Sequence, residues 1–264
     1  MNFDEIDFNQ LYIQQKENSS FKIKSQDAWD KKAFLMNKKV HNSIYNDEFL
    51  SLINIDNCES LLDIGCGVGN LSLKLAQSLK YIYSLDYSKG MLEILEQNAK
   101  ISNLSNIKLI NKSWYDSWED VPKADIVIAS RSMEVINMKE SLKKLDNKAN
   151  KRVYISYKVG GSFLSDEILK VMKRDIVKKP DYIYLVNILY SMGINAQVNF
   201  VKSEGRNTVY TSLEQFIESV SWSIGKLTSN EILELEKYYS KVLKNRKNQI
   251  DYVKWAVISW DKEA

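Results

Sequence analysis

A glycine-rich stretch early in the chain restricts the folds that this sequence can adopt. It reads Leu61-Leu62-Asp63-Ile64-Gly65-Cys66-Gly67-Val68-Gly69-Asn70. An apolar run leads into an acid, three glycines follow at alternate positions, and a helical pattern comes next. This order predicts a strand that turns sharply into a helix. Glycines suit such a turn because a backbone without Cβ lets a ligand lie directly against it. The helix is expected to bury Leu71, Leu75, Ala76 and Leu79 against a sheet.

Residues 81–86 predict a second strand, which ends in Asp86, seventeen residues after Gly69. A carboxylate at this place accepts hydrogen bonds from both hydroxyls of a ribose, so the unit is expected to bind a nucleoside. The dinucleotide fingerprint G-x-G-x-x-G would need a third glycine where Asn70 stands. An acid at the turn also suits a ligand with an ammonium and a sulfonium better than one with phosphates. A nicotinamide or flavin site is the alternative.

The pattern Asp63-x-Gly65-x-Gly67-x-Gly69 resembles motif I of the class I S-adenosylmethionine (SAM) methyltransferases, and Asp86 matches their ribose-binding acid. Residues 27–34 are similar to a W-D-K-R-A stretch that precedes motif I in many small-molecule methyltransferases. The resemblance implies SAM as cofactor, S-adenosylhomocysteine as its product, and methyl transfer to a small molecule by in-line displacement. An RNA methyltransferase and a SAM-binding protein without transferase activity are the alternatives.

The resemblance also implies a set of cofactor-binding residues. Trp29 would lie over the methionine part of SAM and Lys32 near its carboxylate, although a packing tryptophan and a solvated lysine fit the sequence equally well. The family's usual adenine-binding aspartate is replaced by Ser113, a weaker acceptor, beside Trp114, which would stack on the base or simply pack. The expected set is Trp29, Asp63, Gly65, Cys66, Gly67, Gly69, Asn70, Asp86, Tyr87, Ser88, Met91, Ser113, Trp114 and Ser130.

A fourth strand, residues 124–129, ends in Ser130-Arg131-Ser132-Met133-Glu134, which in the resembling fold faces the transferred methyl group. The motif N/D-P-P-Y is absent, which excludes the class of amino-methylating DNA enzymes that carries it. The Pro-Cys motif is also absent, which excludes methylation of cytosine at C5. Arg131 and Glu134 are candidates for holding a polar substrate, with ordinary surface charges as the alternative. The catalytic residue is unassigned, and weak candidates for a base are His41, Glu134, Tyr157 and Lys158. The pattern leaves open whether O, N, S or C is methylated.

Strands and helices alternate along the chain, with further strands expected at residues 106–110, 152–157, 196–201 and 252–258. This predicts an α/β, Rossmann-like, doubly wound sheet of seven strands, mostly parallel with the last antiparallel. We expect a helical cap segment at 1–58, the SAM-binding core at 59–204, a helical insertion over the active site at 205–250, and the final strand within 251–264. Ser212-x-x-Gln215 and Thr228-x-x-Glu231 are expected to be capping boxes that open two helices of the insertion.

Composition excludes several functional classes. No apolar run approaches the roughly 18 residues of a membrane span, and the acidic start differs from a signal peptide, so a cytoplasmic protein is expected. The single His41 and the cysteines Cys58 and Cys66 form no metal-binding pattern. The net charge of +3 is too small to indicate nucleic acid by itself. Positive charge gathers in two groups, both predicted at the edge away from the chemistry: Lys143, Lys144, Lys148, Lys151 and Arg152, and Lys170, Lys173, Arg174, Lys178 and Lys179.

Overall fold

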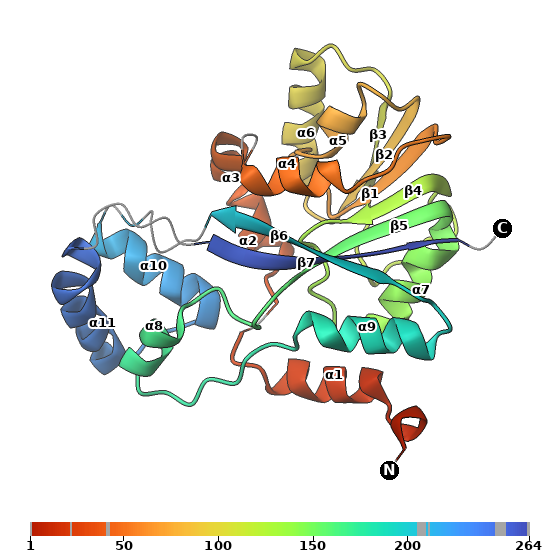
Figure 1. Cartoon of the computed structure of the whole chain (residues 1–264). Helices are drawn as coiled ribbons and strands as arrows, with labels where there is room; N and C mark the ends of the chain where they lie inside the picture. The colour runs from red at the N-terminus through yellow and green to blue at the C-terminus, as the bar shows by residue number, and fades with distance from the viewer. Residues whose placement is uncertain are drawn as a thin grey trace.

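The computed structural model describes residues 2–21, 23–40, 43–204, 210, 212–245 and 252–262. Its centre is a seven-stranded sheet in the order β3-β2-β1-β4-β5-β7-β6, in which β7 runs antiparallel to both of its neighbours (Figure 1). The predicted fold class is therefore confirmed. The strands are β1 (Ser60–Ile64), β2 (Tyr81–Asp86), β3 (Ile107–Asn111), β4 (Ala124–Ala129), β5 (Ala149–Lys158), β6 (Gln197–Glu204) and β7 (Tyr252–Asp261).

Helices cover both faces of the sheet because successive residues of the central strands point to opposite sides. Leu62 packs with α1 (Phe8–Asn18), α7 (Met138–Lys148) and α9 (Tyr182–Ser191), while Leu61 packs with α4 (Ile44–Ser51) and α5 (Ser72–Leu75). The expected helix after the glycine turn is shorter than predicted, since α5 has only four residues. Leu71, Leu75, Ala76 and Leu79 are nevertheless buried, as expected. The remaining helices of this part are η1 (Phe3–Glu5), α2 (Gln26–Asp30), α3 (Ala33–Val40) and α6 (Lys89–Ile101).

A separate helical layer, here called the cap and distinct from the amino-terminal segment 1–58, consists of α8 (Asp166–Val171), α10 (Leu213–Ile224), α11 (Ser229–Lys241) and the short η3 (Leu243–Asn245). It lies beyond the carboxyl end of β6 (Figure 1) and has its own hydrophobic cluster around the fully buried Phe216. Thr228 and Glu231 form the expected capping box, and Ser212 accepts from the backbone N–H of Gln215. The cluster includes Ile168 and Leu169 of α8, which fall within the segment 59–204 expected to form the core.

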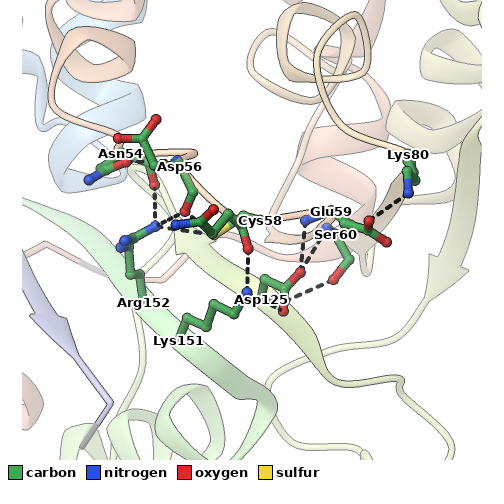
Figure 2. A network of polar contacts seen from close by, with 10 residues as sticks. Asn54, Asp56, Cys58, Glu59, Ser60, Lys80, Asp125, Lys151 and Arg152 are labelled. Carbon is green, nitrogen blue, oxygen red and sulfur yellow. Dashed lines mark hydrogen bonds and ion pairs between the residues drawn. The ribbon is translucent and has the colours of Figure 1, made fainter. Parts of the chain in front are cut away.

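Three members of the first basic group, Lys148, Lys151 and Arg152, lie at the predicted edge and bind the protein's own backbone. The other two are on α7, where Lys143 pairs with Glu140 and Lys144 donates to carbonyls of the loop after β3. Arg152 donates to the carbonyls of Asn54 and Asp56 at 3.2 and 2.8 Å, and Lys151 donates to the carbonyl of Asn57 (Figure 2). Farther along the same edge, Lys148 donates to the carbonyl of Val121 at 2.5 Å. These cations hold the loops at this edge of the sheet in place.

The prediction for the second basic group was wrong, because α8 belongs to the cap. Arg174 forms a two-pronged ion pair with Glu231 of α11, both N–O distances being 2.6 Å. Lys179 lies on the carboxyl side of the sheet and pairs with Glu134 at 2.8 Å. The pattern of α8 fits a helix on a sheet or on other helices equally well, and only tertiary packing selected the second.

The described residues contain neither a membrane-spanning helix nor a metal-binding cluster. In the part of the chain that the structure describes, none of the helices combines the length and the hydrophobicity that crossing a membrane requires. Within the same residues, no three His, Cys, Asp or Glu side chains are grouped so as to hold a metal ion.

Candidate functional site

The strand order reverses between β1 and β4, and ligands of open α/β sheets bind at such a switch point, outside the carboxyl ends of the strands. The glycine turn follows β1 at this place. The backbone N–H groups of Gly65 and Cys66 both donate to the carbonyl of Leu85 in β2, at 2.7 and 3.1 Å. Gly65, Gly67 and Gly69 all have positive φ angles, of 69°, 56° and 92°. The turn therefore needs residues that adopt left-handed conformations without strain.

The three glycines differ in what a side chain would meet. A Cβ on Gly65 would lie 2.3 Å from the Cβ of Ser132, and one on Gly69 would lie 2.1 Å from a methyl carbon of Leu95. A Cβ on Gly67 would meet no atom within 4 Å. The first and third glycines are thus required by the protein's own packing. Gly67 alone presents bare backbone to open space, the shape that a ligand lying against the turn needs.

Asp86 ends β2 beside this open space and is held by the turn itself. One carboxylate oxygen accepts from the N–H of Gly67 and the other from the N–H of Ser88, both at 2.9 Å. Burial raises the pKa of Asp86, while these N–H groups oppose the rise. Each oxygen retains a lone pair that a ribose hydroxyl can use.

Asp63 lies beneath the turn rather than at its surface. Its carboxylate accepts from the hydroxyl of Ser72 at 2.7 Å, and Ser72 is also 2.8 Å from the hydroxyl of Ser84. Burial raises the pKa of Asp63 to about 7. Its contacts join the end of β1 to the start of α5, and so hold the turn from below.

Asn70, which replaces the third glycine of a dinucleotide site, offers an acceptor without a partner. Its side-chain oxygen Oδ1 is buried and receives no hydrogen bond from the described residues. Buried acceptors are rarely left unpaired, and the ammonium of SAM carries only donors. Together with the open cradle over Gly67 and the two free lone pairs of Asp86, this orphaned acceptor fits the polar groups of SAM.

The amino-terminal segment is tied to this site by Asp30, a residue that the sequence reasoning missed. Its carboxylate accepts from the hydroxyl of Ser88 at 2.5 Å and from the N–H of Gly90 at 3.0 Å, at the start of α6. Ser88 in turn caps α6 by accepting from the N–H of Met91. Ser88 and Met91 are both buried. An acid next to a tryptophan was the only sequence signal for Asp30.

Trp29 connects the glycine turn to the cap. It packs in one small cluster with Val68 of the turn. Its ring also meets that of Trp222 of α10 edge-on, with centroids 5.7 Å apart. The ammonium of Lys32 lies over the Trp222 ring, 3.4 Å from the centroid. Two residues expected near the methionine end of SAM are therefore in contact with the cap.

The expected adenine side is also built from the end of a strand. Tyr87 donates its hydroxyl to the carbonyl of Lys24 at 3.1 Å. After β3, the Ser113 hydroxyl accepts from the N–H of Tyr115, and Trp114 donates its ring N–H to the carbonyl of Ser132 at 3.0 Å. Cys66 is buried behind the turn. This hydrogen bond of the ring N–H fixes the position of Trp114, and the rest of its ring is half-buried.

The loop after β4 is held by a set of hydroxyl groups. The hydroxyl of Tyr45 lies 2.7 Å from that of Ser130 and 2.6 Å from that of Ser156 in β5. Ser156 also accepts from the N–H of Arg131, and the hydroxyl of Ser132 donates to the carbonyl of Ile64 at 2.6 Å. These bonds attach the loop to both neighbouring strands.

Arg131 has a φ of +56° although it is not glycine. A left-handed conformation costs such a residue about 1–2 kcal/mol, and strain of this kind gathers at functional sites. Its guanidinium lies over the ring of Tyr45, 4.1 Å from the centroid. Sequence spacing had placed Arg131 here, but neither the strain nor the stacking has a sequence signal.

The described residues among the remaining catalytic and substrate-binding candidates already form contacts within the protein. Glu134 forms ion pairs with Lys16 at 2.5 Å and with Lys179 at 2.8 Å, and these cations lower its pKa. Tyr157 is buried with its hydroxyl 3.4 Å from that of Tyr12, and burial raises its pKa well above the usual value. Lys158 donates to the carbonyl of Val159. His41 lies outside the described residues.

Comparison with known proteins relates this geometry to a family. The family model described as a methyltransferase domain matches residues 55–208. An uncharacterised protein of Haemophilus influenzae is 38% identical over 236 residues, which covers 88% of this chain and 88% of that protein. A probable cobalt-precorrin-6B C(15)-methyltransferase of Methanocaldococcus jannaschii is 31% identical over 58 residues, 22% of this chain and 32% of that protein.

Solved structures show the same fold at low sequence identity. A putative methyltransferase of Bacillus halodurans superposes with a TM-score of 0.59 at 11% identity, covering 83% of this chain and 99% of that chain. A phosphoethanolamine N-methyltransferase of Haemonchus contortus, crystallised with S-adenosylhomocysteine, superposes with a TM-score of 0.57 at 15% identity, covering 92% and 61%. The family match spans the glycine turn, Asp86 and the loop after β4. The chain therefore belongs to the methyltransferase-domain family and is a SAM-dependent methyltransferase.

Proposed function

We propose that this enzyme transfers the methyl group of SAM to a small-molecule acceptor enclosed between the amino-terminal segment and the cap. The observation that carries the proposal is that Trp29 packs against the cluster that contains Val68 of the turn, while its ring also contacts that of Trp222 of α10. This arrangement supports a cap that lies close to the cofactor site. A roofed site suits an acceptor that is small enough to lie beneath the cap.

The residues of the site support binding and alignment. When bound, SAM supplies an electrophilic methyl group on a positively charged sulfur. We infer that Asp86 grips the ribose hydroxyls, that the bare backbone of Gly67 lies against the ligand, and that Asn70 accepts from its ammonium. The hydroxyl set around Tyr45 holds the loop after β4 in place on the acceptor side. Alignment of this kind lowers a barrier by roughly 7–11 kcal/mol.

The chemistry of the described candidates favours an acceptor that does not depend on a strong protein base. A carboxylate is a useful base when its pKa lies near the working pH, whereas two cations lower the pKa of Glu134. Tyr157, with its raised pKa, stays protonated at neutral pH. We infer that alignment contributes more than proton transfer, and that Glu134 and Tyr157 serve to support the loop after β4.

An RNA acceptor is the alternative, since a few partial relatives are RNA methyltransferases, such as an uncharacterised one of Oceanobacillus iheyensis, 31% identical over 77 residues. The placement of positive charge does not favour it. Lys151 and Arg152 bind the protein's own carbonyls at the far edge of the sheet (Figure 2). Lys148 also donates to a backbone carbonyl, and Arg174 is paired within the cap.

A labelling experiment separates the alternatives. The protein is incubated with SAM carrying a tritiated methyl group and with a bacterial extract split into small-molecule and macromolecular fractions. We expect label in the small-molecule fraction, reduced at least tenfold by Trp222→Ala and unchanged by Leu233→Ala, an exposed position on α11. Label only in the macromolecular fraction, released by ribonuclease, would favour the RNA enzyme. Binding of S-adenosylhomocysteine with no label anywhere would favour a protein that binds SAM without transferring it.

A further inference from the structure

The guanidinium of Arg131 lacks the partners that a partly buried cation normally has. Among the described residues, no hydrogen bond or ion pair reaches it, and its contact is with the face of the Tyr45 ring. A guanidinium carries five N–H donors, and stacking on a ring satisfies none of them. Burial lowers the pKa of Arg131, and the charges of Tyr45 and Glu204 oppose this fall only in part. Its donors are available to a ligand.

The position of this guanidinium is fixed before any ligand arrives. Tyr45, on which it stacks, is fully buried and is held by two hydroxyl partners and by the parallel ring of Phe49, 5.7 Å away. The backbone of Arg131 is held in its left-handed conformation by the bond from its N–H to Ser156, at 2.9 Å. A strained residue persists when its surroundings over-determine it. The side chain therefore stands on a rigid platform directly after β4.

Two lysines from other segments of the chain lie against the same loop. Glu134 is the carboxylate of this loop, and it is already shared between Lys16 and Lys179. The side chain of Lys16 is only 1% exposed, so water screens this group poorly. Lys16 and Lys179 together carry one positive charge more than Glu134, and a local excess of this kind attracts anions. The carboxylate that acts on Arg131 itself is Glu204, at the end of β6.

We propose that Arg131 is the anchor for an anionic group, a carboxylate or a phosphate ester, on the methyl acceptor. This inference rests on the proposed function, because it assumes that the acceptor is a small molecule bound beneath the cap. The planar fork of a guanidinium matches two oxygens of a carboxylate or a phosphate at once. It would hold one end of the acceptor and leave the nucleophilic atom free to face the methyl group.

A binding experiment tests Arg131 without requiring methyl transfer. Benzoate, phenyl phosphate and the neutral benzamide are titrated by calorimetry into the protein loaded with S-adenosylhomocysteine. We expect at least one of the two anions to bind at least tenfold more tightly than benzamide, and the preferred anion to identify the group recognised. Arg131→Gln should abolish this preference without changing the affinity for S-adenosylhomocysteine, and Arg131→Lys should retain only part of it. Arg152→Gln, which removes the same charge at the opposite edge of the sheet, should keep it.

Two outcomes would overturn the inference: anions that bind no better than benzamide, or anions that bind Arg131→Gln as tightly as the wild type. The labelling experiment provides a second test when the labelled small molecules are separated by anion exchange. Label in the retained, anionic fraction supports the anchor. Label confined to the unretained fraction refutes it while the proposed function stands. An absence of label in both fractions contradicts the proposed function, and the calorimetric result still decides whether Arg131 binds anions.

Discussion

Adding one methyl group at Gly67 should separate cofactor binding from stability. The backbone there has a φ of +56°, so Gly67→Ala is expected to cost about 1–2 kcal/mol of unfolding free energy. The new Cβ would touch no protein atom within 4 Å, so no clash adds to this cost. It would, however, occupy the space in which the ligand is expected to lie. We expect the affinity for S-adenosylhomocysteine to fall at least tenfold, about 1.4 kcal/mol.

Two matched variants make this result interpretable. Gly193, just after α9, has a φ of +79° and equally open surroundings, so Gly193→Ala should show the same loss of stability with unchanged binding. Gly65→Ala would place its Cβ 2.3 Å from that of Ser132 and should lose more stability than either. Urea unfolding and calorimetric titration with S-adenosylhomocysteine measure both quantities. Wild-type affinity in Gly67→Ala would refute the assignment of Gly67 as the cradle, and so would a stability loss well above that of Gly193→Ala.

Two further outcomes are expected. The pKa of Asp63 is raised from 3.8 to about 7 in the folded state, so the folded protein binds the extra proton and stability should fall as the pH rises from about 3.8 to 7. Asp63→Asn should reduce this decline in urea unfolding at pH 5 and pH 8, and an equally steep decline in the variant would contradict the assignment. Phe216→Ala removes a fully buried ring from the cap and should cost about 3–5 kcal/mol. The exposed Leu233→Ala should cost at most about 0.5 kcal/mol, and equal losses in the two variants would refute the cap's separate core.

Features that depend on neighbours in the chain were predictable. The glycine turn, the strand ending in Asp86 and the alternation of strands and helices follow from local patterns of apolar residues and glycines, and the sheet confirms them. The helix starts at Ser212 and Thr228 were also visible, because a capping side chain bonds a backbone group within the next turn. The three glycines, by contrast, looked alike in the sequence. Their different roles emerged only from what lies opposite each one.

The sequence by itself determined where the chain bends, which residues begin its helices and which face of each element is apolar, because these properties are set by nearest neighbours. Tertiary structure alone decided that α8 packs in the cap, that Asp30 holds Ser88 across 58 positions of sequence, and that Arg131 stacks on Tyr45. An apolar helix face fits several surfaces, and a charged side chain is paired or left unpaired according to residues far away in the chain. Local pattern carries no information about such distant partners.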